Sequence, residues 1–229
     1  MSKGIVVGCD QDHEWMLPWW WSHYTQHNRY PVAFIDLGMS ASAKEWCQAH
    51  GLYLSLQAPR NFIYPKVLIS PELAEGWEKK YGKQVWQSRE KHFYKPFALQ
   101  QTPFDETIWI DLDCEIAGTL APLFSKIHSH SKIALARDSN TEDYTTRVVA
   151  YHHHSPLLAR WTDLCLRQND RFLNDQEALS FLIHAEEIEV TELPSKYNWT
   201  IQKGIHLEAI ILHWAGQWGK EVIRRVVNS

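Results

Sequence analysis

The sequence has few cysteines, and they form no recognisable pair. Its four cysteines are scattered at Cys9, Cys47, Cys114 and Cys165, with no Cys-x-x-Cys spacing among them. A zinc knuckle and a disulfide framework are therefore not indicated. This use of cysteine is typical of a reducing compartment, so we expect the protein to be cytoplasmic.

Long apolar runs and long basic runs are also absent. The apolar stretches fall well short of the ~20 residues that a membrane-spanning helix needs, and the apolar part of the N-terminus is too short for a secretory signal. No basic tract exceeds Arg224-Arg225, and the formal net charge is −4. We therefore expect no integral membrane segment and no nucleic-acid partner.

What remains is an ordinary globular composition with one outlier. The chain has 229 residues, of which 45% are hydrophobic and 22% charged, enough for one domain with a sizeable core. The outlier is tryptophan, with 12 residues. Most of these should be core or half-core residues. A flat aromatic face also suits a sugar ring, so the excess is compatible with a carbohydrate ligand without proving one.

The first quarter of the chain alternates between strand and helix patterns. Strands are expected at 4–10, 32–38 and 52–56, and helices at 15–30 and 42–51. This βαβαβ order predicts an α/β fold with a parallel sheet and helices on its faces. Ligands of such sheets bind beyond the carboxyl ends of the strands.

The remaining segments follow without a linker, a repeat or a low-complexity tract, so we expect one domain over residues 1–229. Residues 57–88 are expected to form an irregular insertion with one helix at 72–81. The other expected elements are helices at 91–100, 156–168, 174–184 and 220–227, strands at 133–138, 148–152, 187–190 and 210–214, and a loop at 193–199.

The segment 107–116 carries two acids after a short apolar run. Asp111 and Asp113 are spaced i and i+2, so in an extended strand their side chains would share a face. Two buried carboxylates repel each other and lose water, and a hard divalent cation removes both costs. The alternative is a strand end whose acids face solvent or cap a turn. The motif alone leaves both interpretations open.

Three consecutive histidines, His152, His153 and His154, invite a metal hypothesis. In a strand only His152 and His154 could share a face, and no carboxylate stands at a short fixed spacing to complete a zinc set. A polar loop is the preferred interpretation.

Four segments, taken in order, resemble one family of enzymes. They are Trp109-Ile110-Asp111-Leu112-Asp113, Asn174-Asp175-Gln176-Glu177-Ala178-Leu179, Leu193-Pro194-Ser195-Lys196-Tyr197-Asn198-Trp199 and Ile211-Leu212-His213-Trp214-Ala215-Gly216-Gln217-Trp218-Gly219-Lys220. Together they resemble the GT-A-fold glycosyltransferases, nearest to the glycogenin and bacterial galactosyltransferase-like group. The last segment departs from the family pattern because it lacks the family's proline.

The resemblance implies a single GT-A-like domain with a mostly parallel sheet and helices on both faces. Residues 1–116 would be a Rossmann-like half that binds the nucleotide-sugar. Residues 117–229 would supply the acceptor side and a C-terminal metal and phosphate segment. The implied reaction is metal-dependent transfer of a sugar from a nucleotide-diphospho-sugar, with a UDP-sugar as the expected donor. The acceptor would be a glycan, a lipid or a protein.

The resemblance also assigns a metal and phosphate site. Asp111, Asp113 and His213 would bind Mn²⁺ or Mg²⁺, and Lys220 would reach a phosphate oxygen. A bound cation offsets the charge that develops on a diphosphate leaving group. For His213 the alternative is an ordinary core histidine.

Nucleotide and sugar contacts follow from the same resemblance. Residues 8–10, Lys95 and Asp111 would bind the nucleotide-sugar, the first of these being Gly8, Cys9 and Asp10. For Lys95 the alternative is a solvated helical lysine, and for Asp10 a turn or cap acid.

Asp175 and Gln176 would lie on the donor-sugar face and take part in catalysis. Their alternative is a helix N-terminus capped by Asn174, and both interpretations can hold together.

One departure from the family pattern and the tryptophan excess keep other functions open. The chain has Thr145-Thr146-Arg147 where the family often has Asn-Ser-Gly, which leaves the donor-sugar preference undetermined. This departure and the tryptophan excess allow a non-catalytic nucleotide-sugar or glycan-binding module. A sugar-nucleotidyltransferase is a weaker alternative, because the loop after the first strand, residues 8–14, is acidic and not basic.

Overall fold

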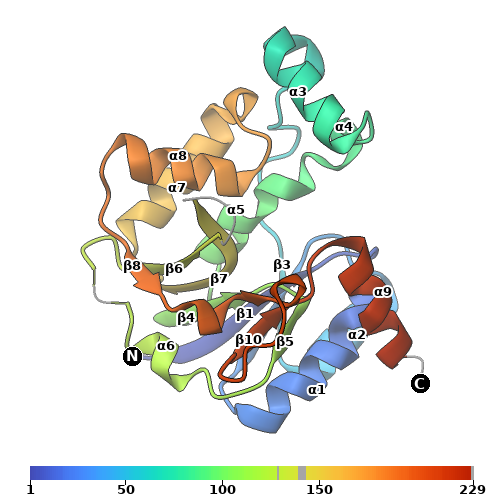
Figure 1. Ribbon diagram of the computed structural model, residues 1–229, viewed down its shortest axis with the longest axis vertical. Helices are drawn as coiled ribbons and strands as arrows, with labels where there is room; N and C mark the ends of the chain where they lie inside the picture. The colour runs from blue at the N-terminus through green and yellow to red at the C-terminus, as the bar shows by residue number, and fades with distance from the viewer. Residues whose placement is uncertain (128, 139–142, 228–229) are drawn as a thin grey trace.

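The computed structural model describes residues 1–127, 129–138 and 143–227, and its centre is a seven-stranded sheet (Figure 1). The strand order is β3-β2-β1-β4-β7-β6-β8. The strands are β1 (Lys3–Cys9), β2 (Val32–Asp36), β3 (Leu52–Ser55), β4 (Glu106–Ile110), β6 (Ile133–Arg137), β7 (Tyr144–His152) and β8 (Thr191–Leu193).

The sheet is mostly parallel, as predicted. Strands β3, β2, β1 and β4 run parallel to one another, and so do β6 and β8. Only β7 is antiparallel to both of its neighbours. The direction in which strands are added reverses between β1 and β4. A crevice outside the carboxyl ends of these two strands is the expected ligand position in such a sheet.

Helices cover both faces of the sheet because the central strands are apolar on both sides. In β1, Ile5 and Val7 belong to one buried cluster and Val6 to the other, as strand alternation requires. The first face is covered by α1 (Leu17–His27), α2 (Ala41–His50), α6 (Ala121–Phe124) and α9 (Gly216–Val227). The second face is covered by α5 (Tyr94–Gln100), α7 (Pro156–Arg167) and α8 (Asp175–Ala185).

A second sheet of three strands lies beyond β4. Its order is β5-β10-β9, with bounds Cys114–Ile116, Ile211–His213 and Trp199–Thr200. β10 confirms the predicted strand at 210–214. The predicted loop at 193–199 is only partly correct, because it holds a 3-10 helix at Ser195–Tyr197 and the start of β9.

The strand predicted at 187–190 is wrong. β8 begins at Thr191, because the preceding residues still close the end of α8. The Ile188 N–H donates to the Ile183 carbonyl at 2.9 Å, and Glu187 has a φ of 49°. Alternating apolar side chains there satisfied a strand pattern, yet Ile188 and Val190 pack against the second buried cluster from an irregular segment.

The insertion between β3 and β4 projects from the sheet layers (Figure 1). Its predicted helix is confirmed as α3 (Pro71–Tyr81), and a short α4 (Val85–Ser88) follows. Lys91–Phe93 forms a 3-10 turn that leads into α5. Pro96 lies in the first turn of α5, where its missing N–H breaks no helical hydrogen bond.

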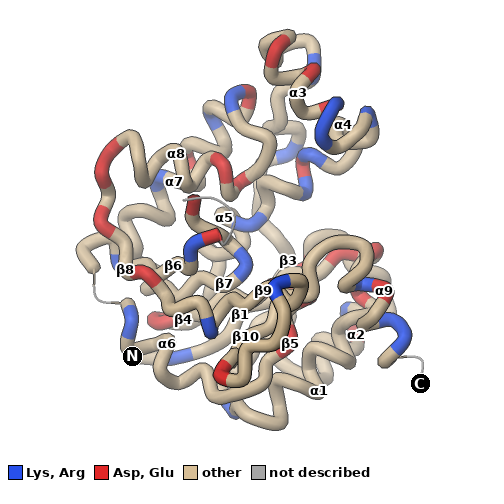
Figure 2. Tube along the Cα trace, viewed as in Figure 1, with Lys and Arg blue, Asp and Glu red and all other residues tan. Residues whose placement is uncertain are grey.

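Tryptophan is a core or half-buried residue at eleven of its twelve positions, as expected, and Trp218 is the exposed exception at 56%. Acidic and basic residues are interspersed along the chain, and α3 and α9 each carry both signs (Figure 2). Within the described ranges, every helix is too short or too polar to cross a membrane.

Candidate active site

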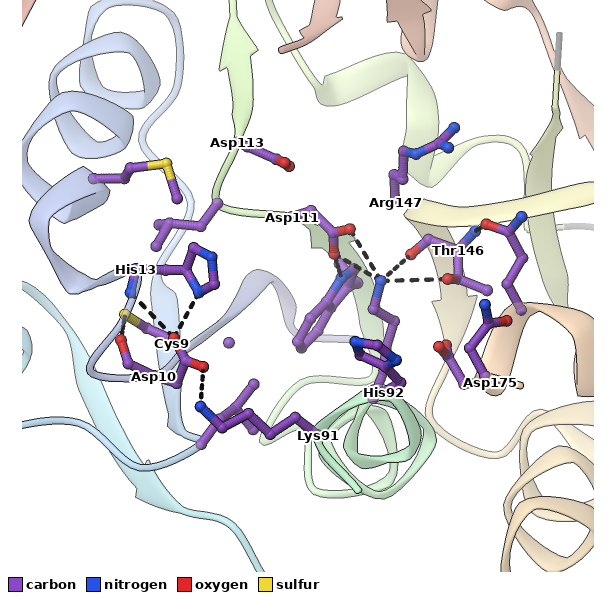
Figure 3. A pocket seen from close by; sticks show the side chains of 18 of the residues that line it. Cys9, Asp10, His13, Lys91, His92, Asp111, Asp113, Thr146, Arg147 and Asp175 are labelled. Atoms are coloured by element: carbon purple, nitrogen blue, oxygen red, sulfur yellow. Dashed lines mark hydrogen bonds and ion pairs between the residues drawn. The ribbon is translucent and has the colours of Figure 1, made fainter. Parts of the chain in front are cut away.

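A cavity of about 390 Å³ opens at the carboxyl ends of β1 and β4, at the point where the strand order reverses (Figure 3). It gathers side chains from both ends of the sequence. All of the predicted site residues line it except His213: Gly8, Cys9, Asp10, Lys95, Asp111, Asp113, Asp175, Gln176 and Lys220. His213 is buried directly behind Asp113, at 5% exposure.

The end of β1 forms one wall. Gly8 is required there, because a Cβ would stand 2.6 Å from the Trp109 ring and 2.8 Å from Leu37. Cys9 is buried, and burial raises the pKa of its thiol, so the thiol stays protonated and only the backbone is suited to a polar ligand. This segment can therefore bring its backbone close to a ligand.

Asp10 is fixed at the mouth of this wall by two neighbours. Its carboxylate accepts the His13 N–H, lies 2.7 Å from His13 Nδ1, and lies 2.9 Å from the Lys91 Nζ. Burial alone would raise the pKa of Asp10, but the bonds from His13 and Lys91 outweigh it and lower the pKa. Asp10 is therefore an ionised, oriented acceptor.

Asp111 and Asp113 line the cavity from a turn, which corrects the prediction that an extended strand presents them. β4 ends at Ile110, and the Cys114 N–H closes the turn onto the Asp111 carbonyl at 3.1 Å. The turn, and not strand alternation, sets their directions, because the chain must reverse into β5 to join the second sheet.

Asp111 is held by a half-buried lysine and an indole. Lys95 Nζ lies 2.8 Å from Asp111 Oδ1, and Trp109 Nε1 donates to the same oxygen at 2.6 Å. Lys95 also donates to the Thr146 carbonyl at 2.9 Å. Burial opposes the charge of Lys95, but Asp111 and Asp175 outweigh that effect and raise its pKa. Lys95 is thus a half-buried, ion-paired cation and not the solvated helical lysine of the alternative interpretation.

Asp113 is held by two groups from the C-terminal segment. Its Oδ2 lies 3.4 Å from Lys220 Nζ and 3.6 Å from His213 Nε2. Burial alone would raise the pKa of Asp113, but His213 and Lys220 lower it, so this carboxylate is ionised. The turn that carries Asp111 and Asp113 is called the D-x-D turn below. This pairing joins it to β10, which carries His213, and to α9, which carries Lys220.

The residue types fit a hard divalent cation, although the three expected ligands do not converge. Among the residues that the structure describes, no three His, Cys, Asp or Glu side chains form one metal-binding cluster. The Asp113–His213 distance of 3.6 Å is too long for a hydrogen bond. The other imidazole nitrogen, Nδ1, is buried without a partner. A neutral imidazole and a carboxylate are both groups that can bind a divalent cation.

A bulge in β7 supplies the wall opposite β1. Leu135 of β6 pairs with Val149, but the next residue, Ala136, pairs with Thr145, so residues 146–148 have no partner on β6. Backbone carbonyls of the bulge residues accept hydrogen bonds from groups of the site. The Thr146 carbonyl accepts from Lys95, and the Arg147 carbonyl accepts the Asp111 N–H at 2.9 Å. Bulges commonly re-aim side chains beside active sites.

The start of α8 completes the cavity. Asn174 caps the helix as expected, accepting the Glu177 N–H at 2.9 Å, while the Glu177 carboxylate accepts the Leu173 N–H at 2.8 Å. Gln176 Oε1 accepts the Thr146 N–H at 3.4 Å. Burial raises the pKa of Asp175 to about 6, and its Oδ2 is buried without a partner. A buried carboxylate that has a raised pKa and one oxygen without a hydrogen-bond partner, and that lines a cavity, is a strong functional candidate.

The cavity also contains residues that the sequence interpretation did not assign to the site: His13, Lys91, His92 and Arg147. Lys91 is spaced four residues before Lys95, and His13 three residues after Asp10, so helical and turn spacing could have indicated both. His152 ends β7, and His153 and His154 form the turn after it, away from the cavity lining. The polar-loop interpretation of this triplet agrees with that position.

Comparison with solved structures identifies the fold. No family model matches the sequence, and no curated protein matches it either. Among solved structures, glycosyltransferase GlyE of Streptococcus pneumoniae TIGR4 has a TM-score of 0.66 at 15% identity, over 100% of this chain and 61% of that one. Galactosyltransferase LgtC, solved with donor and acceptor sugar analogs, has a TM-score of 0.64 at 11% identity, over 98% of this chain and 95% of that one.

Mouse xyloside xylosyltransferase 1 is a third similar structure, with a TM-score of 0.60 at 13% identity, over 95% of this chain and 98% of that one. The chain thus spans about 61% of the length of the GlyE structure and nearly all of the other two. At these identities the likeness establishes the fold.

Proposed function

We propose that this chain, which has the GT-A glycosyltransferase fold, transfers a sugar from a nucleotide-diphospho-sugar to an acceptor with the help of a divalent cation. The observation that carries the proposal is the pairing of the two D-x-D acids with separate cationic groups in one cavity: Lys95 on Asp111, and Lys220 with His213 on Asp113. This paired set stands at the switch point of the sheet, where nucleotide ligands bind.

Three groups of cavity residues would contact three different parts of the proposed donor. The β1 end, with Gly8, Cys9 and Asp10, would bind the base and ribose of the nucleotide, for which uridine is the expected base. The D-x-D turn and Lys220 would face the diphosphate. Asp175 and Gln176 would face the donor sugar from the start of α8.

Asp111, Asp113 and His213 would hold Mn²⁺ or Mg²⁺, which when bound supplies charge neutralisation to the departing diphosphate. The chain's own residues do the remaining work. Lys95 fixes the Asp111 carboxylate in place, and Lys220 brings a second positive charge to the phosphate side. Asp175 has a pKa of about 6, so near neutral pH it can accept a hydrogen bond or a proton from the sugar or the acceptor.

The location and the acceptor remain parts of the proposal. All four cysteines are free and buried, which suits a reducing compartment, so the cytoplasm is the proposed location. The LgtC structure with donor and acceptor analogs supports a cavity that serves both substrates. A glycan, lipid or protein acceptor would approach from the side of α8 and the β7 bulge.

The test is a panel of nucleotide-sugars, UDP-linked and GDP-linked, incubated with the protein and Mn²⁺ and assayed for release of nucleoside diphosphate. We expect release from at least one UDP-sugar, and loss of release in Asp175→Asn. Arg160→Gln, an exposed change on α7, serves as the control that keeps activity. Binding of a nucleotide-sugar without release, with or without an added acceptor mixture, would favour the non-catalytic module instead.

A further inference from the structure

Arg147 lines the cavity, and the proposed roles leave its side chain unexplained. It sits in the β7 bulge between Thr146 and Val148, where the strand has no partner on β6. Its backbone is pinned on the β4 side, because its carbonyl accepts the Asp111 N–H and its own N–H donates to Thr145 Oγ1 at 3.2 Å. The bulge therefore holds the base of the Arg147 side chain firmly beside the D-x-D turn.

The side chain stands at the sugar end of the cavity. In Figure 3, Cys9, Asp10 and His13 lie on one side of Asp111, while Arg147 and Asp175 lie on the other. The proposed nucleotide wall and Arg147 thus lie at opposite ends, with the proposed diphosphate position between them. A group that reaches Arg147 belongs to the sugar or to the acceptor, and not to the nucleoside.

Arg147 differs from the lysines of the cavity because its carboxylate partner lies outside the cavity lining. Each lysine there has a carboxylate partner in the same cavity: Lys91 with Asp10, Lys95 with Asp111, and Lys220 with Asp113. Arg147 instead contacts Asp138, which does not line the cavity, through Nη2 at 3.5 Å.

That contact leaves most of the guanidinium available. A separation of 3.5 Å is at the outer limit of a hydrogen bond. A guanidinium has five N–H donors in a planar fork, and within the described ranges its side chain has no further polar contact. The Arg147 side chain is only 25% exposed, so water satisfies these donors incompletely.

We propose that Arg147 binds a carboxylate or a phosphate carried by a sugar, so that this site acts on an acidic sugar. The inference rests on the proposed glycosyltransferase function and adds the chemical class of the substrate. A planar guanidinium matches an oxyanion through two parallel hydrogen bonds, which a neutral hydroxyl cannot reproduce. A neutral sugar would leave most N–H donors of this half-buried guanidinium without a matching acceptor, which disfavours that sugar.

The oxyanion could belong to the donor sugar or to the acceptor, and two calorimetric arms distinguish these sources. In the donor arm, UDP, UDP-glucose and UDP-glucuronate are titrated in the presence of Mn²⁺. In the acceptor arm, the UDP-loaded protein is titrated with methyl glucoside, methyl glucuronoside and glucose 6-phosphate. We expect the acidic ligand to bind roughly tenfold or more tightly than its neutral counterpart in one arm.

Variants of Arg147 test whether its side chain causes the preference for the acidic ligand. Arg147→Gln should remove the preference for the acidic ligand while leaving the affinity for UDP alone within about twofold, since a single charge-assisted contact to the sugar is lost. Arg147→Lys keeps the charge without the fork and should retain part of the preference. Arg160→Gln, whose partner Glu186 lies outside the cavity, should change nothing. Melting curves identify any variant that fails to fold. If Arg147→Gln does not fold, the loss of preference is measured in Arg147→Lys instead.

Three outcomes would overturn the inference. Equal affinity for acidic and neutral ligands in both arms would show that Arg147 selects no anion. An equal loss of UDP and UDP-sugar affinity in Arg147→Gln would assign the guanidinium to the diphosphate. Failure of the wild-type protein to bind UDP at all would defeat the proposed function and this inference together. Intact UDP binding without acid preference would defeat only the inference.

Discussion

Lys95 Nζ lies 2.8 Å from Asp111 Oδ1 and donates to the Thr146 carbonyl at 2.9 Å, so one ammonium group joins α5, the D-x-D turn and the β7 bulge. The three elements come from separate parts of the chain and meet only through the sheet order β1-β4-β7. The ion pair is 16% and 25% exposed at its two side chains, so solvent screens it only partly. It therefore serves both the stability of the fold and the charge balance of the cavity.

Replacing Lys95 by Met should destabilise the protein, because it leaves Asp111 partly buried without its cation. The expected loss is about 1–3 kcal/mol in the free energy of unfolding, below the full value for a wholly buried pair because Asp111 keeps some contact with water. Urea denaturation measures it, with Lys79→Met on the exposed side of α3 as the matched control. Adding Asp111→Asn should restore part of the stability but no nucleotide binding. A Lys95→Met protein as stable as the wild type would contradict this role.

Asp175 makes stability fall as the pH rises. Its pKa is raised from 3.8 to about 6 in the folded protein, so the folded state favours the protonated acid. The stability from this group is present below pH ~4 and is lost as the pH rises through about 6. Asp175→Asn cannot ionise. Relative to the wild type it should therefore gain stability between pH 4 and pH 7, on the order of 1–3 kcal/mol, while transfer activity is lost.

Melting curves at pH 4.5, 6 and 7.5 test the Asp175 prediction. Asp163→Asn, an exposed acid on α7, is the control and should show no such trend. A stability difference between Asp175→Asn and the wild type that stays constant across this pH range would show that the carboxylate titrates normally.

Lys220 should contribute to diphosphate binding more than to monophosphate binding. It lines the cavity from α9 and lies 3.4 Å from Asp113, on the proposed phosphate side. Lys220→Ala is expected to weaken UDP binding by about 1–3 kcal/mol, the scale of a charge-assisted hydrogen bond, and UMP binding much less. Arg225→Ala, exposed on the same helix, is the control. Equal losses for UDP and UMP would mean that Lys220 does not contact the distal phosphate.

The features that were predictable from the sequence depend on local patterns. The βαβαβ alternation over residues 4–56 follows from apolar periodicity and turn residues, and it is sufficient to place Asp10 at a strand end. The α8 cap at Asn174 is also a local signal, since side chain and backbone partners lie within four residues. From these local patterns, most of the cavity residues could be assigned to the correct helix or strand end.

The features that were missed depend on long-range pairing. β7 pairs with β4 in a continuous register, but its pairing with β6 shifts after Leu135 and produces the bulge. No local sequence pattern predicts this shift, because it depends on strands that are distant in the chain. The sequence therefore marks Arg147 only as a departure from a family motif, whereas the bulge makes it a cavity residue. The D-x-D turn likewise follows from the antiparallel pairing of β5 with β10, about 95 residues apart in the chain. Without that pairing, an extended strand was the simpler prediction.

The central claim is that the D-x-D turn holds a nucleoside diphosphate through a divalent cation, and calorimetry with UDP tests it most directly. The wild-type protein and Asp113→Asn are each titrated with UDP, once with Mn²⁺ and once with a chelator. The account predicts that the wild type binds UDP at least about tenfold more tightly with Mn²⁺, and that Asp113→Asn loses this gain while keeping its fold. UDP affinity that is the same with Mn²⁺ and with chelator, or unchanged in Asp113→Asn, would contradict it.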